Sequence, residues 1–194
     1  MHTTQCDGCG VLTPSHDITH YGSIEQGYIN LCSLCFNADV AERCGLEDFE
    51  NIRLEPIGMT DSTGQTREFH FVTRLLGNIL SLQAFELQDG TPAGYQFQII
   101  GDPEDDIFAL LGRMIEKIRC ALSVKYLTED PKFGLQIADQ IVRGNIESDP
   151  SFDERTPLLT IDGREVTWEE FGQILMTFEG SQFKLELFDP SDEP

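Results

Sequence analysis

The sequence has few basic residues and no long apolar run. Only 13 Lys and Arg residues stand against 34 Asp and Glu residues, which gives a formal net charge of −21 at pH 7. Since proteins bind nucleic acids largely through Lys and Arg contacts to phosphates, this charge argues against DNA or RNA as a partner. No apolar run approaches the ~18 residues that a transmembrane helix needs, so we expect no membrane span.

The start of the chain has neither the basic residues nor the apolar stretch of a secretory signal peptide. We therefore expect a cytoplasmic protein. In a reducing compartment the six cysteines are expected to be metal ligands or free thiols rather than disulfides. The apolar content of 40% is that of a folded globular chain.

Sequence motifs for catalysis are also missing. There is no Gly-x-Ser-x-Gly elbow, no phosphate-binding glycine loop and no His-Glu-x-x-His pair. His70 is the only histidine beyond residue 20, and it lies between Phe69 and Phe71. We favour a structural imidazole here over a general base, because no acid or nucleophile can be assigned to it.

Two cysteine pairs provide the strongest signal in the sequence: Cys6 with Cys9, and Cys32 with Cys35. Each pair has Cys-x-x-Cys spacing, and 22 residues separate the pairs. Each such turn directs two sulfur atoms to one centre, and two turns supply the four thiolates of a tetrahedral structural zinc. We therefore predict a structural Zn²⁺ ion at these four residues. Because a four-thiolate site has no open position for water, we do not expect this metal to be catalytic.

Three other residues near these pairs are alternative ligands. Cys44 lies about 13 Å beyond Cys35 along a helix, too far to share a metal, and we predict a buried thiol that packs the helix. His16 or His20 could replace one cysteine, but two matched pairs favour the all-thiolate set.

The residues that follow the second pair have a helical period. Four of them share one face: Phe36, Val40, Ala41 and Cys44. Gly45 suits a left-handed C-cap, and residues 21–31 alternate as a short hairpin would. A knuckle, a hairpin and a helix that carries the last ligand in its first turn resemble a treble-clef zinc finger, here spanning residues 1–46.

The rest of the chain predicts strands and two helices. Residues 69–72, 79–87 and 95–99 read as an antiparallel meander. An apolar helical stripe follows: Ile107, Leu110, Leu111, Met114, Ile115, Ile118 and Leu122. Asp102 is the predicted N-cap of this helix, with Pro103 in the first position. The acidic residues 104–106 are expected in the first turn, where the helix dipole favours negative charge. Cys120 falls outside the stripe, as an exposed thiol.

Further strands and a short helix are predicted toward the C-terminus. Strands 158–161 and 164–166 flank an Asp162-Gly163 turn, and a weaker strand is expected near 141–147. Thr167 and Glu170 form a capping box for the second helix, which Gly180 ends. Phe171, Ile174, Leu175 and Phe178 are expected to face the core. A closing strand over 183–188 should direct Phe183, Leu185 and Leu187 inward.

These elements do not alternate as βαβα, so we predict an α+β fold. Its parts are a treble-clef-like finger at 1–46, a domain at 47–188 with a mostly antiparallel sheet and two helices, and an acidic tail at 189–194.

The chain also resembles, over its whole length, a bacterial family of unassigned function with an N-terminal zinc finger. The stretches that carry this resemblance are the two cysteine pairs, GYQFQIIGDPEDD at 94–106 and IDGREVTWEEF at 161–171. The resemblance implies a bacterial cytoplasmic protein and transfers no catalytic residue.

Three functional hypotheses follow. The first is a zinc-stabilised binding or adaptor protein whose acidic surface engages another, basic, protein. The second is an enzyme whose site forms around His70. The third is an acidic inhibitor that mimics nucleic acid, which requires carboxylates spaced like phosphates.

Overall fold

The computed structural model describes residues 2–25, 27–149, 151 and 155–191. The described strands are β1 (Thr3–Gln5), β2 (Leu12–Pro14), β3 (Ile18–Ser23), β4 (Gly27–Cys32), β5 (Ile57–Thr60), β6 (Thr66–Leu75), β7 (Leu80–Gln88), β8 (Thr91–Gly101), β9 (Leu127–Asp130), β10 (Gly134–Ile137), β11 (Asn145–Ser148), β12 (Pro157–Ile161) and β13 (Arg164–Thr167). The helices are α1 (Ser33–Cys44), α2 (Ile107–Ser123) and α3 (Trp168–Met176), with a 3-10 turn at Ser15–Asp17. All strand pairs in these ranges are antiparallel, which confirms the α+β prediction.

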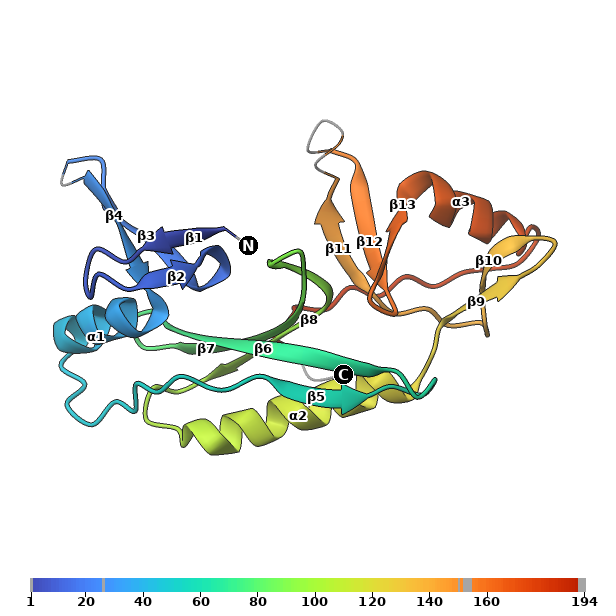
Figure 1. Cartoon of the computed structure of the whole chain (residues 1–194). Helices are drawn as coiled ribbons and strands as arrows, with labels where there is room; N and C mark the ends of the chain where they lie inside the picture. Colours follow the sequence, from blue (N-terminus) through green and yellow to red (C-terminus); the bar gives the residue numbers. More distant parts are fainter. Residues whose placement is uncertain (1, 26, 150, 152–154, 192–194) are drawn as a thin grey trace.

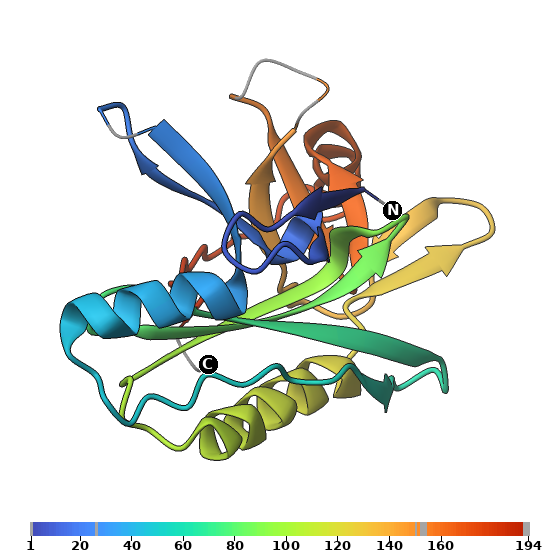
Figure 2. The same ribbon diagram turned by 60° about the vertical axis from the view of Figure 1, so that its left-hand side comes forward.

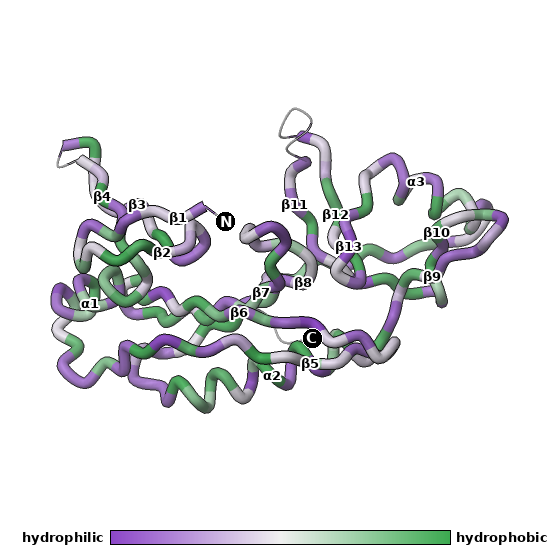
Figure 3. The backbone as a smooth tube through the Cα atoms, viewed as in Figure 1, coloured by the Kyte–Doolittle hydropathy of each residue, from purple (hydrophilic) through white to green (hydrophobic). Residues whose placement is uncertain are grey.

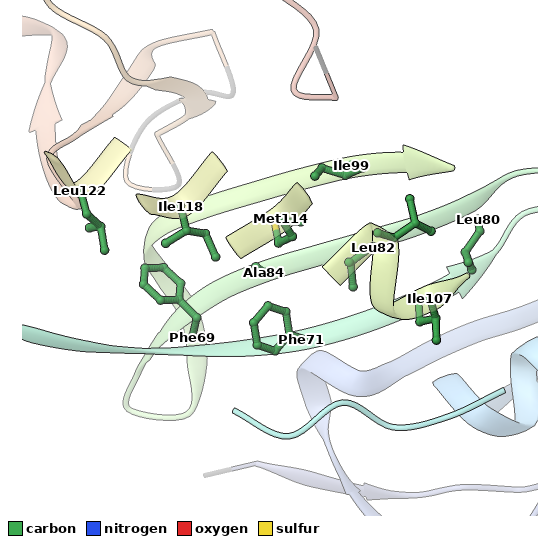
Figure 4. Close-up of a cluster of buried hydrophobic side chains, with 11 residues drawn as sticks. Phe69, Phe71, Leu80, Leu82, Ala84, Ile99, Ile107, Met114, Ile118 and Leu122 are labelled. Atoms are coloured by element: carbon green, nitrogen blue, oxygen red, sulfur yellow. The ribbon is translucent and has the colours of Figure 1, made fainter. Parts of the chain in front are cut away.

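A four-stranded sheet, in the order β5-β6-β7-β8, forms the centre of the molecule. Helix α2 covers one side of this sheet, and α1 lies on the other side (Figures 1 and 2). Apolar residues recur along α2 and the strands above it (Figure 3). The buried side chains between them form the main core: Phe69, Phe71, Leu80, Leu82, Ala84, Ile99, Ile107, Leu110, Met114, Ile118 and Leu122 (Figure 4). The predicted meander and the predicted helical stripe are both present.

The predicted start of α2 is wrong. The helix begins at Ile107, and Asp106, not Asp102, is its N-cap, since the Asp106 carboxylate accepts a hydrogen bond from the Phe108 amide. Asp102 instead accepts from the Glu104 amide in a preceding turn. The two aspartates have the same capping chemistry, so composition alone could not choose between them.

The cysteine-rich module contains the predicted hairpin, β3–β4, and the predicted helix, α1, which ends at Gly45 with φ of 70°. A second small hairpin, β1–β2, was not predicted. The prediction for Cys44 is wrong, because this thiol is exposed. It lies in the last turn of α1, beyond the buried residues of that helix, the last of which is Ala41.

The C-terminal module has its own small core: Leu127, Leu159, Ile161, Val166 and Ile174. The β12–β13 hairpin and the Thr167/Glu170 capping box are present as predicted. The weaker predicted strand corresponds to β11, and the β9–β10 hairpin was missed. Helix α3 ends at Met176 rather than at Gly180, and Leu175 faces solvent rather than the core.

The predicted closing strand is also wrong. Residues 181–189 form no strand, and Phe183 is 91% exposed. The alternating pattern is real, but no sheet edge pairs with it in the described chain. The expected acidic tail is described only to residue 191; residues 192–194 lie outside the described part. None of the described helices combines the length and apolarity that a membrane crossing requires.

Candidate metal site

Three elements bring the four paired cysteines together. Cys6 and Cys9 lie in the β1–β2 turn, Cys32 ends β4, and Cys35 lies in the first turn of α1. The turn is closed by hydrogen bonds from the Cys6 amide to the Val11 carbonyl (3.0 Å) and from the Gly10 amide to the Cys6 carbonyl (2.8 Å).

The turn and β4 are tied together directly. The Asp7 amide donates to the Asn30 carbonyl at 2.7 Å, and the Asn30 amide donates to the Asp7 carboxylate at 2.7 Å. A side chain at Gly8 would lie 3.0 Å from the Cys35 sulfur, so a glycine suits this close approach. These local contacts fix where both cysteine pairs point.

The four sulfur atoms all lie within 4.8 Å of one another. The Cys9 and Cys32 sulfurs are 3.9 Å apart. Tetrahedral zinc with Zn–S bonds of about 2.3 Å separates its sulfurs by ~3.8 Å, so the donor set fits a single metal ion. Cys6 and Cys32 are buried and Cys9 is exposed, which leaves one side open for the ion to enter.

The surroundings favour thiolate at one of these positions. Burial would raise the pKa of Cys6, but hydrogen bonds from the backbone of Cys32, Cys9 and Gly8 outweigh it and lower that pKa to about 6. One of these donors is the Cys32 amide, which lies 3.2 Å from the Cys6 sulfur. Burial and the neighbouring thiols raise the pKa of Cys35 well above its ordinary value. A bound divalent cation would favour the charged Cys35 thiolate and so oppose both effects.

The alternative ligands lie elsewhere. Among the described residues, the group of metal-ligating side chains contains the four paired cysteines and excludes His16, His20 and Cys44. His16 packs edge-on against Phe85, with ring centroids 5.3 Å apart. Cys120 is exposed on α2, as predicted.

Asn37, in α1, connects this module to the sheet, and sequence reasoning missed it. Its side chain is fully buried. The Asn37 amide nitrogen donates to the Thr73 carbonyl at 3.1 Å, and its oxygen accepts from the Leu75 amide at 2.8 Å. Nothing in the sequence marks this asparagine, because its partners lie 36 and 38 residues away.

A second candidate site surrounds His70. A cavity of about 130 Å³ lies between the cysteine-rich module and β6, and its lining includes His16, Asp17, Arg53 and His70. His70 Nε2 lies 3.0 Å from a Glu68 oxygen, and the ring stacks on Phe85. Arg53 pairs with one oxygen of the buried Asp17 at 3.0 Å.

Two polar atoms beside this cavity are unusual. Asp17 Oδ1 and His16 Nδ1 are buried, and neither has a hydrogen-bond partner in the described part of the chain. Burial lowers the pKa of His16, which favours its neutral form. The sequence could not have brought Asp17 and His70 together, since 53 positions separate them.

Three successive segments of the chain match domain families without an assigned function. Residues 5–47 match Domain of unknown function DUF7685, residues 50–123 match DUF7686, and residues 126–192 match DUF7713. No curated protein and no solved structure matches the chain. The three segments contain, in order, the cysteine-rich module, the central sheet with α2, and the C-terminal module. The chain is thus similar to families of unassigned function, and the matches name no activity or ligand.

Proposed function

We propose that this chain is a cytoplasmic, zinc-stabilised binding protein that engages a basic protein partner through its cysteine-rich module. Zinc is the metal that suits four thiolates in a tetrahedral set. The free state of all six cysteines suits a reducing compartment.

The observation that carries the proposal is a set of exposed apolar side chains on the two hairpins of an acidic module. We name it the finger patch: Val11, Leu12, Ile24, Tyr28 and Ile29. Ile24 is 92% exposed, and the β3–β4 hairpin that carries most of the patch projects away from the rest of the chain (Figures 1 and 2). Three of the five residues, Ile24, Tyr28 and Ile29, lie close together on the β3–β4 hairpin, and exposed apolar residues close together are typical of protein interaction sites.

The charge of the module selects the partner. Up to Gly45 the one basic side chain is Arg43, which pairs with Asp39 at 2.8 Å, and the acidic residues are Asp7, Asp17, Glu25, Asp39 and Glu42. Four thiolates around one divalent ion add further negative charge. A basic surface is the complement that such a module attracts, and the attraction weakens with salt.

Affinity capture from the native host tests the proposal, with the zinc-loaded full chain as bait. The double variant Ile24→Ser with Tyr28→Ser removes the tip of the finger patch, and Phe133→Ser removes an equally exposed aromatic residue on the C-terminal module. Cobalt(II) absorption checks that each variant still binds metal through four thiolates.

We expect a basic protein to be enriched by the wild type and by Phe133→Ser, and to be lost by at least about tenfold with the double variant. Raising the salt concentration should release it. Enrichment of no salt-sensitive protein, or equal capture by the double variant, would contradict the proposal.

An enzyme is the second candidate, supported by the cavity that contains His70, His16 and Asp17. A thermal-shift screen of metabolites would test it, with His70→Gln as the paired variant. A ligand that stabilises the wild type and not His70→Gln supports this function. The absence of any such ligand removes it.

A further inference from the structure

One edge of β6 is paired with a strand along only part of its length. Strand β5 pairs with Thr66–Phe69 of β6, from the pair Thr60 and Thr66 to the pair Ile57 and Phe69. Strand β7 occupies the opposite edge of residues 70–75. In the described chain, no strand pairs with residues 70–75 on the β5 side.

The Asn37 side chain takes the place of a strand there. A neighbouring strand would offer one acceptor and one donor to this edge, and the Asn37 amide group offers the same pair to Leu75 N–H and Thr73 C=O. Leu75 itself is fully buried and packs with Cys6, Cys32 and Phe36. The part of the β6 edge that no strand covers is therefore occupied by the Asn37 amide group and by the apolar cluster around Leu75.

Asn37 lies close to two of the candidate metal ligands along α1, and the Asn51 side chain also ties this turn by donating to the Leu34 carbonyl at 2.7 Å. Cys32 is the N-cap residue of α1, and Cys35 lies two positions before Asn37. The helix has no side-chain hydrogen bond at its N-cap and no acidic residue in its first turn. Its start therefore has no Ser, Thr, Asp or Asn cap and depends on the Cys32 sulfur, which interacts with the Cys35 amide, and a metal ion bonded to both cysteines would fix that sulfur in place.

We propose that metal occupancy of the four-cysteine site controls the open edge of β6. With metal bound, the first turn of α1 holds Asn37 against the strand and the edge is closed. Without metal, four unpaired thiols no longer fix that turn, Asn37 withdraws, and the backbone of residues 73–75 opens. This coupling is independent of the partner proposed above, and its test uses no partner.

Hydrogen exchange of single amides, followed by NMR on the full chain, tests the coupling. The chain is compared with one equivalent of Zn²⁺ and after removal of zinc by a chelator under reducing conditions. The Leu75 amide reports on the edge, and the amides of Leu82 and Ile99 report on the sheet. We expect Leu75 to exchange at least about 30-fold faster without metal, and Leu82 and Ile99 to change by less than about threefold.

A variant separates the amide clasp from the metal itself. Asn37→Ala should exchange rapidly at Leu75 even when loaded, while Co²⁺ still gives the thiolate charge-transfer absorption of the wild type. Asn30→Ala is the control, because the Asn30 backbone, not its side chain, makes the contacts to Asp7. If Asn37→Ala fails to fold, the comparison of the wild-type chain with and without zinc still tests the coupling.

Two results would overturn the proposal. One is a Leu75 amide that stays equally protected after zinc removal. The other is equal acceleration at Leu75, Leu82 and Ile99, which would mean that the metal stabilises the whole fold rather than this edge.

Discussion

The small core of the C-terminal module makes Val166→Ala an informative perturbation. Val166 is fully buried in a cluster of five residues that shares no member with the central core. Losing two methyl groups there should cost about 1.5–3 kcal/mol, including the cavity. A unit of about 50 residues has a free energy of unfolding of roughly 2.5–7.5 kcal/mol, so this loss is a large share.

Few contacts join this module to the central sheet. Asn145 donates to the Gln96 carbonyl at 3.2 Å, Gln96 donates to Glu147 at 2.9 Å, and Gly163 lies against the Tyr95 ring. We therefore expect the module to unfold on its own, ahead of the sheet.

Native-state hydrogen exchange at increasing denaturant measures this. In Val166→Ala, the opening free energy of the β12–β13 amides should fall by about 1.5–3 kcal/mol, while that of the β7 amides stays within about 0.5 kcal/mol. Ile118→Val, in the central core, should lower the opening free energy of the β7 amides and leave that of the β12–β13 amides unchanged. If the β7 amides lose as much stability as those of β12 in Val166→Ala, residues 47–188 unfold as one unit and the reasoning fails.

Three further predictions concern the metal, a helix cap and the C-terminal segment. Burial raises the pKa of Cys32 and of Cys35, so both thiols are protonated at pH 7 without metal. Zinc binding should therefore release at least two protons and strengthen as pH rises. Titration calorimetry in two buffers that differ in ionisation enthalpy measures the number of protons released, and one proton or fewer would contradict the prediction. Asp106→Ala should lower stability to denaturant by about 1 kcal/mol, and Asp102→Ala by less than half as much; the reverse order would make Asp102 the cap. Leu187→Ser should leave the thermal midpoint unchanged within about 1 °C, because this side chain is 71% exposed, and a clear loss would show that the segment packs in solution.

The features that the sequence predicted are those that depend on neighbours a few positions away. Each Cys-x-x-Cys turn brings its own two sulfur atoms together within four residues, and the Thr167/Glu170 capping box also closes within four residues. The β12–β13 hairpin needs only its Asp162-Gly163 turn, whose two residues have φ of 54° and 70°.

The wrong predictions are those in which several local solutions are equal or a distant partner decides. Residues 102–106 contain three aspartates that can each accept a backbone hydrogen bond, and the packing of Ile107 under the sheet decides which one starts the helix. The alternation at 183–188 is that of a strand, yet a strand also needs a free edge at the right place. Cys44 shows the same limit, because whether a helix face is covered to its last turn depends on the body beneath it.

The role of Asn37 depends on both its position in α1 and its partners in β6. In the middle of a helix, a short polar side chain reads as a weak helix former, and nothing nearby explains it. Its amide becomes meaningful only beside β6, where it satisfies one donor and one acceptor that burial would otherwise leave unpaired at a cost of about 1–3 kcal/mol each. Two positions separate it from Cys35, so Asn37 links the turn that carries the cysteine to the central sheet, alongside the packing of Leu75 on Cys6 and Cys32 and the hydrogen bond from Arg74 to the His16 carbonyl (2.9 Å). The candidate metal site, which the sequence predicts from four residues of one module, is thereby connected to the strand edge of the neighbouring module.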